Sequence, residues 1–368
     1  MPTQQEKPTV VLAGGGTGGH VYPALALGEA MARRGYPLRY YGDAGRLEGR
    51  VVPERGIAFH AIPAMQYPRG GLVGKLRFAW ALLQNVLVCR RLLQEHRAGL
   101  VLGVGGYISA PPVLAAWTLG IPRAVHEANV TPGLANRLCA RVADLVLLTY
   151  SATGAKLPGK APRHTVGCPV NPKVLQGDRD VAALRYGLDP ARPTLLVVGG
   201  SLGAATINLL GIALAQDPTR AWQVALVTGP SYFDATSAAL APLPAGVSVV
   251  AYEDHIADAY ALADLVMCRA GSSTLAELAL LGKPAILVPS PNVTDNHQEH
   301  NARGIEAEGA AVVIVERDLD VAAAVAAVAA LMADGPRRAE MTANARRLGR
   351  PNTAEEVADL LVALMVAR

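Results

Sequence analysis

The sequence predicts an α/β protein made of two Rossmann-like domains, each built on a doubly wound parallel sheet. Residues 9–13 form a short apolar run that leads into a glycine-rich turn and then into a helical pattern. Residues 195–204 repeat this strand and glycine turn in the second half of the chain. Strand-like runs alternate with helical segments around both motifs, which is typical of parallel sheets with helices on both faces.

The domain organisation follows from chain length and composition. A chain of 368 residues suits two domains of roughly 150–200 residues each. Proline, glycine and polar residues cluster at 162–172. We therefore expect domains at 1–166 and 167–350 that face a cleft, with a C-terminal helix at 351–368 that rejoins the first domain.

Charge is distributed unevenly between these domains. Residues 1–166 hold 19 Lys and Arg against 8 Asp and Glu, a net +11, whereas the remainder carries −7. A basic first domain indicates an anionic partner. An acidic membrane surface is favoured over nucleic acid, because no basic stripe interleaved with aromatic residues occurs.

Composition also argues against several classes of protein. Residues 1–8 lack the apolar run of a signal peptide, and the longest uncharged apolar stretch, 321–333, is too short to cross a bilayer. The four cysteines lie far apart and the histidines lack metal-ligand spacing. Asp178-x-Asp180 and Asp318-x-Asp320 each precede a helical run and fit helix caps. We expect a cytosolic protein that needs no metal and no cofactor.

The two glycine turns are candidate phosphate sites. Gly14-x-Gly16-x-x-Gly19 satisfies the dinucleotide fingerprint, in which backbone N–H groups at a helix N-terminus hold a phosphate. Asp43 lies near the end of the second strand, where a nicotinamide-binding site would need an acidic residue, so a nicotinamide cofactor remains an alternative. A purely structural glycine turn is the other alternative. The second turn, which contains Ser201, favours two anion sites instead.

A third turn between strand and helix spans residues 268–277. It exposes the N–H groups of Ser272, Ser273 and Thr274, and Glu277 follows one helical turn later, where it could accept hydrogen bonds from a ribose diol. A capping box explains the same residues without a ligand. Both roles are compatible.

Further polar residues follow predicted strands, at the sheet edge where ligands of open α/β folds bind. Gln298 belongs to the polar segment 295–301 after the strand at 285–288. In the first domain the residues at this edge are Gly105, Gly106, Tyr107, Glu127 and Asn129, together with His20. Each of these first-domain residues taken singly is weak evidence, because a lone polar residue after a strand more often has a structural role.

Taken together, these motifs resemble the family of bacterial transferases that add N-acetylglucosamine to lipid-linked N-acetylmuramyl-pentapeptide. The family has the two-domain fold called GT-B and performs the last cytosolic step of peptidoglycan precursor synthesis. The resemblance covers nearly the whole chain. It rests on six ordered motifs: residues 15–20 (GGTGGH), 105–107 (GGY), 126–129 (HEAN), 199–204 (GGSLGA), 268–277 (CRAGSSTLAE) and 295–298 (DNHQ).

The resemblance implies that the second domain binds the UDP-sugar and the first binds the acceptor. Glu277 would hold the ribose, backbone near Glu253 would frame the uracil, and Asn129 and Gln298 would contact the sugar. The remaining donor contacts would come from small residues at helix N-termini: Thr17, Gly18, Gly19, Ser201, Ser272, Ser273 and Thr274. Acceptor and diphosphate contacts are assigned to Gly15, Gly16, Gly105, Gly106 and Tyr107.

The implied reaction is inverting displacement at the anomeric carbon of UDP-N-acetylglucosamine by the muramyl 4-hydroxyl. His20 is the first choice as general base, since an imidazole titrates near neutrality, and Glu127 is the second. His20 could instead bind an acceptor phosphate. Helix N-terminal amides would meet the charge of the leaving UDP. Cys168 and Asn171 depart from the family's usual Gly-Asn-Pro-Val-Arg, which puts a donor contact at Asn171 in doubt.

Other functions remain open at this stage. Another GT-B enzyme, either a lipid glycosyltransferase or a UDP-N-acetylglucosamine 2-epimerase, shares the predicted fold. The second glycine turn argues against a nicotinamide-dependent oxidoreductase. A non-catalytic sugar-binding protein would normally be exported, and no signal peptide is present.

The segment 69–83 is predicted to dock on a membrane. Leu72, Leu76 and Trp80 share one helical face, while Lys75 and Arg77 lie where they can meet anionic headgroups. We therefore expect a peripheral protein on the cytoplasmic face of the cell membrane. Its expected partners are UDP-N-acetylglucosamine, undecaprenyl-diphosphate-linked N-acetylmuramyl-pentapeptide, anionic lipid, and proteins of cell-wall synthesis and division, with no nucleic acid.

Overall fold

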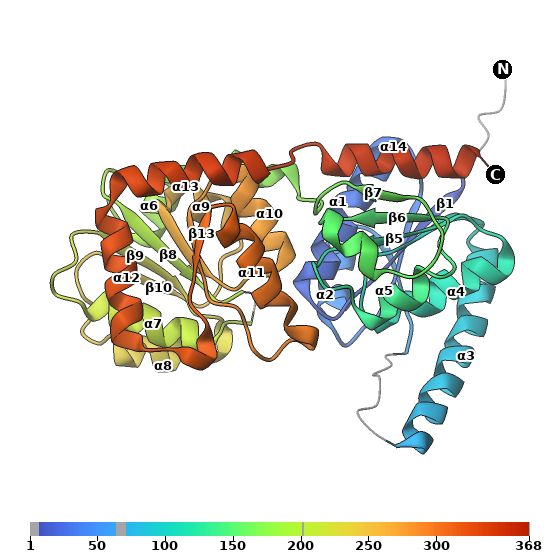
Figure 1. Ribbon diagram of the computed structural model, residues 1–368, viewed down its shortest axis with the longest axis horizontal. Coiled ribbons are helices and arrows are strands. Elements are labelled where there is room, and N and C mark those ends of the chain that lie inside the picture. The colour runs from blue at the N-terminus through green and yellow to red at the C-terminus, as the bar shows by residue number, and fades with distance from the viewer. Residues whose placement is uncertain (1–6, 64–70, 201, 368) are drawn as a thin grey trace. The chain divides into compact units, whose positions relative to one another are not determined.

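The computed structural model describes residues 7–63, 71–200 and 202–367, which form two compact units (Figure 1). Unit 1 contains the chain up to Asn171 and again from Asn352, and unit 2 contains Pro172–Pro351. The boundary therefore lies between Asn171 and Pro172, slightly later than the boundary expected from the sequence.

Unit 1 is a parallel sheet of seven strands in the order β3-β2-β1-β4-β5-β6-β7. The strands are β1 (Thr9–Ala13), β2 (Leu38–Gly42), β3 (Ala58–Ala61), β4 (Ala98–Gly103), β5 (Arg123–Glu127), β6 (Leu145–Leu148) and β7 (Arg163–Thr165). The helices are α1 (Gly18–Arg33), α2 (Leu47–Glu54), α3 (Leu72–Glu95), α4 (Ala110–Leu119), α5 (Leu134–Cys139) and α14 (Thr353–Val366), with 3-10 turns η1 (Tyr107–Ser109) and η2 (Ser151–Lys156).

Unit 2 is a parallel sheet of six strands in the order β10-β9-β8-β11-β12-β13. The strands are β8 (Thr194–Val198), β9 (Gln223–Val227), β10 (Val247–Val250), β11 (Leu265–Cys268), β12 (Ala285–Leu287) and β13 (Ala311–Val313). The helices are α6 (Arg179–Tyr186), α7 (Ala205–Gln216), α8 (Phe233–Ala239), α9 (Ile256–Leu262), α10 (Ser272–Leu281), α11 (His297–Ala307), α12 (Val321–Ala333) and α13 (Gly335–Leu348). Short 3-10 turns are η3 (Pro172–Gln176), η4 (Pro230–Tyr232), η5 (Thr294–Asn296) and η6 (Glu316–Asp318).

Both sheets reverse their strand order at the strand that carries a glycine turn. In unit 1 the reversal lies between β1 and β4, where Ala13 pairs with Gly103. In unit 2 it lies between β8 and β11, where Val198 pairs with Cys268. Loops that follow the two strands at such a point leave toward opposite faces of the sheet and open a crevice for ligands. The predicted fold of two Rossmann-like units is confirmed.

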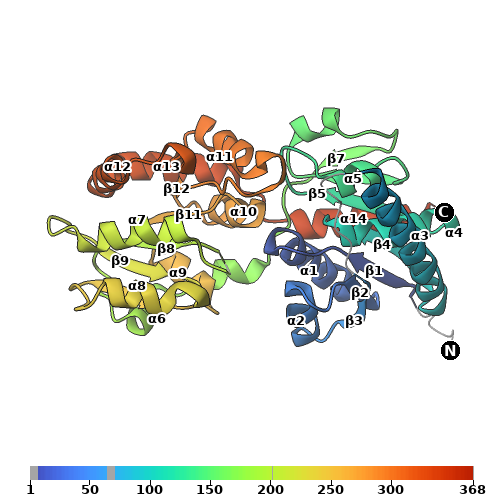
Figure 2. The same ribbon diagram turned by 90° about the horizontal axis from the view of Figure 1, so that it is seen from below.

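Strand β1 shows why the sequence forms a buried parallel sheet. Val10 and Leu12 pack on one face in the cluster formed with α1, α2 and α14. Val11 and Ala13 pack on the other face in the cluster formed with α3 and α4. Figure 2 shows β2, β1, β4 and β5 of unit 1 following one another across the sheet, in the order in which they pair. Because both faces are covered, the strand has an unbroken apolar sequence with no polar alternation.

The C-terminal helix α14 returns to unit 1 and packs on α1. Val357, Ala358 and Leu361 are fully buried in the core of unit 1. The hydroxyl of Thr353 donates to the carbonyl of Val166 at 3.0 Å. These contacts join the last segment of the chain to the first domain.

Helix α3 has two different halves. Cys89 and Leu93 in its second half are fully buried, whereas its first half stands away from the sheet (Figure 1). Among the described residues, α3 is the one helix long and apolar enough, by length and composition, to cross a membrane. This differs from the expectation drawn from uncharged runs, because Lys75 and Arg77 interrupt the apolar sequence of α3.

The two Asp-x-Asp sequences contribute helix caps. The carboxylate of Asp178 accepts from the N–H groups of Asp180 and Val181 at the start of α6. Asp320 accepts from Ala323 N–H at the start of α12. The predicted capping role is confirmed at these two positions.

Removing one partner of a buried ion pair should destabilise unit 1 strongly. Arg123 is 6% exposed and its Nη2 lies 3.1 Å from Asp144 Oδ1. Asp144→Ala leaves a buried guanidinium without its carboxylate, so we expect the free energy of unfolding to fall by about 3–5 kcal/mol. Urea denaturation followed by circular dichroism measures it.

Asp359→Ala is the matched control. It breaks an ion pair of unit 1 in which the Asp359 side chain is 73% exposed, so it should cost less than about 1 kcal/mol. Equal losses in the two variants would contradict the expected dependence on burial.

Candidate active site

The two glycine loops of unit 1 pack backbone against backbone. The N–H of Gly15, between β1 and α1, donates to the carbonyl of Gly105, after β4, at 3.3 Å. A Cβ atom on Gly106 would lie 2.6 Å from the carbonyl oxygen of Gly15. Gly106 also has φ +76°, a conformation that residues with a side chain rarely adopt. Only glycine permits this approach, which brings the predicted residues of both loops together.

His20 lies in the first turn of α1, directly above this contact. Its Nδ1 is 3.1 Å from the carbonyl oxygen of Gly15 and 3.4 Å from Oγ1 of Thr17. A Cβ on Gly105 would lie 2.8 Å from His20 Nε2, so the ring rests against that loop. Because a carbonyl only accepts, Nδ1 carries the proton and Nε2 presents a lone pair.

The protonation state of His20 follows from its surroundings. Burial lowers the pKa of His20, and the hydrogen bond to Gly15 and the charge of Glu48 only partly offset this effect. The imidazole is therefore neutral at neutral pH. A neutral imidazole with a free Nε2 lone pair can accept a proton from a hydroxyl group.

Glu127, the second candidate base, is fully engaged within its own loop. Its Oε1 accepts from the N–H of Asn129 at 2.9 Å, and its Oε2 accepts from the N–H of Gly133 at 3.1 Å and from Asn136 Nδ2 at 2.9 Å. The side chain is 1% exposed, and burial raises the pKa of Glu127 against these hydrogen bonds. These hydrogen bonds hold the loop that carries Asn129.

Tyr107 connects the second glycine loop to α3. Its ring meets the ring of Phe78 edge-on, with centroids 6.0 Å apart. Gly105 and Gly106, directly before it, contact His20 and Gly15. The loop beside His20 is thus in contact with the helix predicted to dock on the membrane.

In unit 2 the glycine turn after β8 is also tightly packed. Gly203 has φ +78°, and a Cβ there would lie 2.0 Å from the carbonyl oxygen of Thr228. Ser201, the predicted phosphate contact in this turn, lies outside the described residues. The turn leads into α7, whose N-cap is Ala204.

The third predicted motif is the N-terminus of α10. Ser272, Ser273 and Thr274 form its first turn after the N-cap residue Gly271, so their N–H groups lie at the N-terminal end of the helix. Ser272 is buried, and its hydroxyl accepts from Asn301 Nδ2 of α11 at 3.2 Å. The N-cap makes no side-chain hydrogen bond, so the capping-box alternative is not formed here.

Glu277 lies one turn further along α10 and is paired with a phenol. Tyr260 of α9 donates its hydroxyl to Glu277 Oε2 at 3.1 Å. Burial raises the pKa of Glu277 to about 7, which exceeds the opposite effect of that hydrogen bond. Oε1 remains for a ligand hydroxyl, and its strength as an acceptor depends on whether the carboxyl is ionised.

Gln298 and Glu253 are both held by hydrogen bonds within unit 2. Gln298 Oε1 accepts from Ser290 N–H at 2.9 Å, which leaves its NH2 group as the donor toward a ligand. Glu253 accepts from the hydroxyl of Tyr186 at 2.6 Å and from Arg185 Nη1 at 3.1 Å. The Glu253 side chain is thereby occupied, which agrees with a role for its backbone alone.

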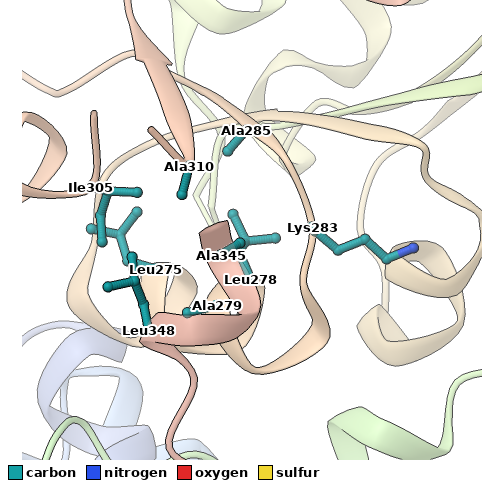
Figure 3. A pocket seen from close by; sticks show the side chains of 9 residues that line it. All are labelled: Leu275, Leu278, Ala279, Lys283, Ala285, Ile305, Ala310, Ala345 and Leu348. Carbon is teal, nitrogen blue, oxygen red and sulfur yellow. The ribbon is translucent and has the colours of Figure 1, made fainter. Parts of the chain in front are cut away.

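Among the described residues, unit 2 contains two hollows of different size and lining. The larger, of about 220 Å³, lies beside the start of α11 and is lined by Pro289, Pro291, Asn296, Glu299, Val315, Glu316 and Arg317. The smaller is apolar apart from Lys283, whose amino end points away from the other side chains (Figure 3). It is lined by Leu275, Leu278, Ala279, Lys283, Ala285, Ile305, Ala310, Ala345 and Leu348. It contains none of the predicted site residues.

Four polar residues of the site were not predicted: Glu48, Asn136, Tyr260 and Asn301. Each is buried and bonds to a loop or side chain that was predicted. Asn136 and Asn301 interrupt the buried faces of short helices, and that signal could have found them. Tyr260 has no such signal, because a buried tyrosine is ordinary in a core.

Comparison with known protein families decides the class of this protein. Residues 10–148 match the glycosyltransferase family 28 N-terminal domain, and residues 194–360 match the glycosyltransferase family 28 C-terminal domain. The chain belongs to glycosyltransferase family 28. The chain is therefore a glycosyltransferase, and the resemblance drawn from the motifs is confirmed. The alternative of a nicotinamide-dependent oxidoreductase is excluded.

Individual relatives are similar over their whole length. A protein of Desulforudis audaxviator is 39% identical, with 96% of this chain and 97% of the relative covered. One of Salinibacter ruber is also 39% identical, with 97% of each chain covered. Both are named UDP-N-acetylglucosamine–N-acetylmuramyl-(pentapeptide) pyrophosphoryl-undecaprenol N-acetylglucosamine transferase.

Solved structures agree on the fold. MurG of Acinetobacter baumannii superposes with a TM-score of 0.75 at 27% identity, covering 97% of this chain and 99% of that one. UDP-GlcNAc 2-epimerase of Neisseria meningitidis gives 0.67 at 13% identity, covering 98% and 100%, a likeness that shows the fold alone. The calicheamicin glycosyltransferase CalG4 gives 0.68 at 16% identity, covering 98% and 99%, with the same limit.

The burial of Glu277 predicts an unusual titration of its carboxyl group. Carbon-13 NMR of the glutamate carboxyls should show Glu277 titrating near pH 7, the value to which burial raises its pKa. Because the pKa of Glu277 is higher in the folded protein, protonation of this carboxyl stabilises the folded state. This contribution to the free energy of unfolding is complete below its ordinary pKa of 4.5 and is lost as pH rises through about 7.

Tyr260→Phe is the accompanying variant. The hydroxyl of Tyr260 lowers the pKa of Glu277 by donating to its carboxylate, so its removal should raise the titration midpoint. A midpoint that falls in Tyr260→Phe would show that this hydrogen bond is not formed.

Proposed function

We propose that this chain transfers N-acetylglucosamine from UDP-N-acetylglucosamine to the 4-hydroxyl of a lipid-linked N-acetylmuramyl-pentapeptide, with inversion at the anomeric carbon. The names of full-length relatives support the donor and the acceptor. The observation that carries the chemistry is His20, whose neutral ring presents Nε2 with no hydrogen-bond partner in the described part of the chain.

The proposal divides the work between the two units. In unit 2, the N–H groups of Ser272, Ser273 and Thr274 receive the donor diphosphate, with Ser201 and the turn after β8, and Glu277 accepts a ribose hydroxyl. An α-helix N-terminus favours negative charge, so it also stabilises UDP as it leaves. Gln298 and Asn129 contact the sugar, and backbone near Glu253 frames the uracil.

Unit 1 supplies the base and the acceptor site in this proposal. The Gly15–Gly16 and Gly105–Gly106 loops with Tyr107 meet the acceptor and its diphosphate. Thr17, Gly18 and Gly19 at the start of α1 contribute further contacts to the UDP-sugar donor. His20 Nε2 takes the proton of the muramyl hydroxyl as its oxygen attacks the anomeric carbon. The bond from that carbon to the UDP oxygen breaks on the opposite side.

Release of UDP tests this function. The protein should release UDP from UDP-N-acetylglucosamine only when lipid-linked muramyl-pentapeptide is present. His20→Ala should lower turnover by about 10²–10⁴-fold, because the general base is lost, and should leave UDP affinity nearly unchanged. Coupled UDP detection gives turnover, and calorimetry gives affinity.

Glu277→Ala is the matched variant in unit 2. Loss of a hydrogen bond to a charged acceptor should weaken UDP binding by roughly 1.5–3 kcal/mol. Near-normal turnover of His20→Ala at saturating acceptor would remove His20 as the base and advance Glu127. Formation of the 2-epimer without any acceptor would overturn the transferase proposal itself.

The proposal also places unit 1 on the cytoplasmic face of an anionic membrane, beside proteins of cell-wall synthesis and division. Leu72, Leu76 and Trp80 on the first half of α3 are 74%, 61% and 62% exposed. Lys75 and Arg77 lie among them and are exposed as well. Apolar side chains presented to solvent with flanking cations suit shallow insertion among lipid headgroups.

Charge reversal tests the membrane surface. Lys75→Glu with Arg77→Glu should reduce co-sedimentation with anionic vesicles at low salt by tenfold or more, since each headgroup contact by a basic residue contributes about 1 kcal/mol. Arg50→Glu with Lys160→Glu makes the same charge change in unit 1 away from α3 and should bind much more tightly. Equal binding by the two variants would argue against α3 as the docking surface.

A further inference from the structure

Glu48 of α2 is a fully buried carboxylate beneath the first glycine loop. It is 0% exposed, and among the described residues no lysine or arginine forms an ion pair with it. Its Oε2 accepts from Gly16 N–H at 3.1 Å, and its Oε1 accepts from Asp43 N–H at 3.3 Å. A Cβ on Gly15 would lie 2.0 Å from Oε1, so the carboxylate lies against the loop itself.

One peptide group connects this carboxylate to His20. Glu48 accepts the N–H of Gly16, and His20 Nδ1 donates to the carbonyl of Gly15. That N–H and that carbonyl belong to the same peptide bond, between Gly15 and Gly16. The three groups therefore form a continuous chain of hydrogen bonds from carboxylate through peptide to imidazole.

Such a chain is electrostatically cooperative. A carboxylate that accepts an amide proton polarises the peptide and makes its carbonyl oxygen a stronger acceptor. A stronger acceptor at Nδ1–H makes the opposite nitrogen, Nε2, more basic and stabilises the imidazolium that forms when a proton arrives.

We propose that Glu48 is a positioning residue for His20, which holds the imidazole in its reactive tautomer and raises its basicity through the Gly15–Gly16 peptide. The proposal rests on His20 being the base of the proposed function. No proton crosses the peptide: Nε2 takes the proton of the acceptor hydroxyl, and Nδ1–H stays bonded to Gly15.

Loop anchoring alone does not account for a carboxylate at this position. The loop is already held by Tyr40, whose hydroxyl donates to Gly14 at 2.9 Å, and by the bond from Gly15 to Gly105. A neutral amide or hydroxyl would accept the Gly16 N–H without burying a charge. Burial of an unpaired charge is costly, so its retention points to an electrostatic role.

The other charged and titratable groups around His20 and Glu48 do not replace this role. His126 of β5 is buried, which lowers its pKa to about 4, so it is neutral beside His20. Burial and the charge of Glu48 raise the pKa of Tyr40, which keeps that phenol neutral. Asp43 lies 3.8 Å from Arg46, which offsets its charge. Glu48 is thus the anion whose field reaches His20.

Glu48→Gln tests the proposal directly, since glutamine has the same shape and keeps one acceptor oxygen. Nitrogen-15 NMR of labelled histidine should show the His20 midpoint at lower pH than in the unsubstituted protein. The acid limb of kcat/KM should move to lower pH with it, and kcat should fall roughly tenfold because the base is weaker. UDP affinity should not change, because unit 2 is untouched.

Tyr40→Phe is the matched control. It removes the anchor of the neighbouring carbonyl without removing a charge, so the His20 midpoint should stay in place. An unchanged midpoint in folded Glu48→Gln, or an equal shift in Tyr40→Phe, would overturn the proposal. If the titration midpoint of His20 moves in Glu48→Gln while the pH profile of kcat/KM does not, the coupling between Glu48 and His20 is upheld. That result would also show that His20 is not the general base.

A measurement without substitution covers the case in which Glu48→Gln does not fold. The amide nitrogen of Gly16 lies inside the chain of hydrogen bonds, so its resonance should titrate with the His20 midpoint in the unsubstituted protein. A Gly16 resonance that stays flat through that midpoint would overturn the proposal.

Discussion

The close contact of two backbone loops in unit 1 is the constraint on which the rest of its site depends. Gly15 and Gly106 approach until no Cβ fits between them, and the contact occurs where β1 and β4 end side by side. Because β1 and β4 are parallel neighbours, both loops leave the sheet at the same edge. The ring of His20 can rest on Gly105 only because Gly105 has no side chain.

The candidate site of unit 2 is built in a different way from that of unit 1. It places a helix N-terminus at the end of β11, and the polar residues behind that turn are set by α9 and α11 through Tyr260 and Asn301. One carboxyl, Glu277, lies in this region, and burial raises its pKa to about 7, so its charge is only partly developed near neutral pH. Unit 1, in contrast, buries the side chain of Glu48 next to its glycine loop.

Sequence reasoning reached the sheets, the glycine loops and the exposed face of α3 because these features are local. A glycine run after an apolar strand predicts its own turn, and apolar residues at helical spacing predict a face. The roles of Glu48 and Tyr260 were not predicted, because each role depends on which peptide or side chain lies opposite. Those neighbours are determined by strand order and helix packing. Glu127 was predicted as a catalytic alternative, yet the hydrogen bonds from Gly133 and Asn136 that occupy it come from residues further along the chain.

The contact between Phe78 and Tyr107 has a consequence for how the enzyme finds its acceptor. It connects the exposed half of α3 to the loop beside His20. A protein docked through that half would hold its reactive loop at a fixed height over the lipid surface and would search for acceptor in two dimensions. Its rate would then follow the mole fraction of acceptor in the leaflet, and diluting the same acceptor into more lipid would slow the reaction even at constant bulk concentration.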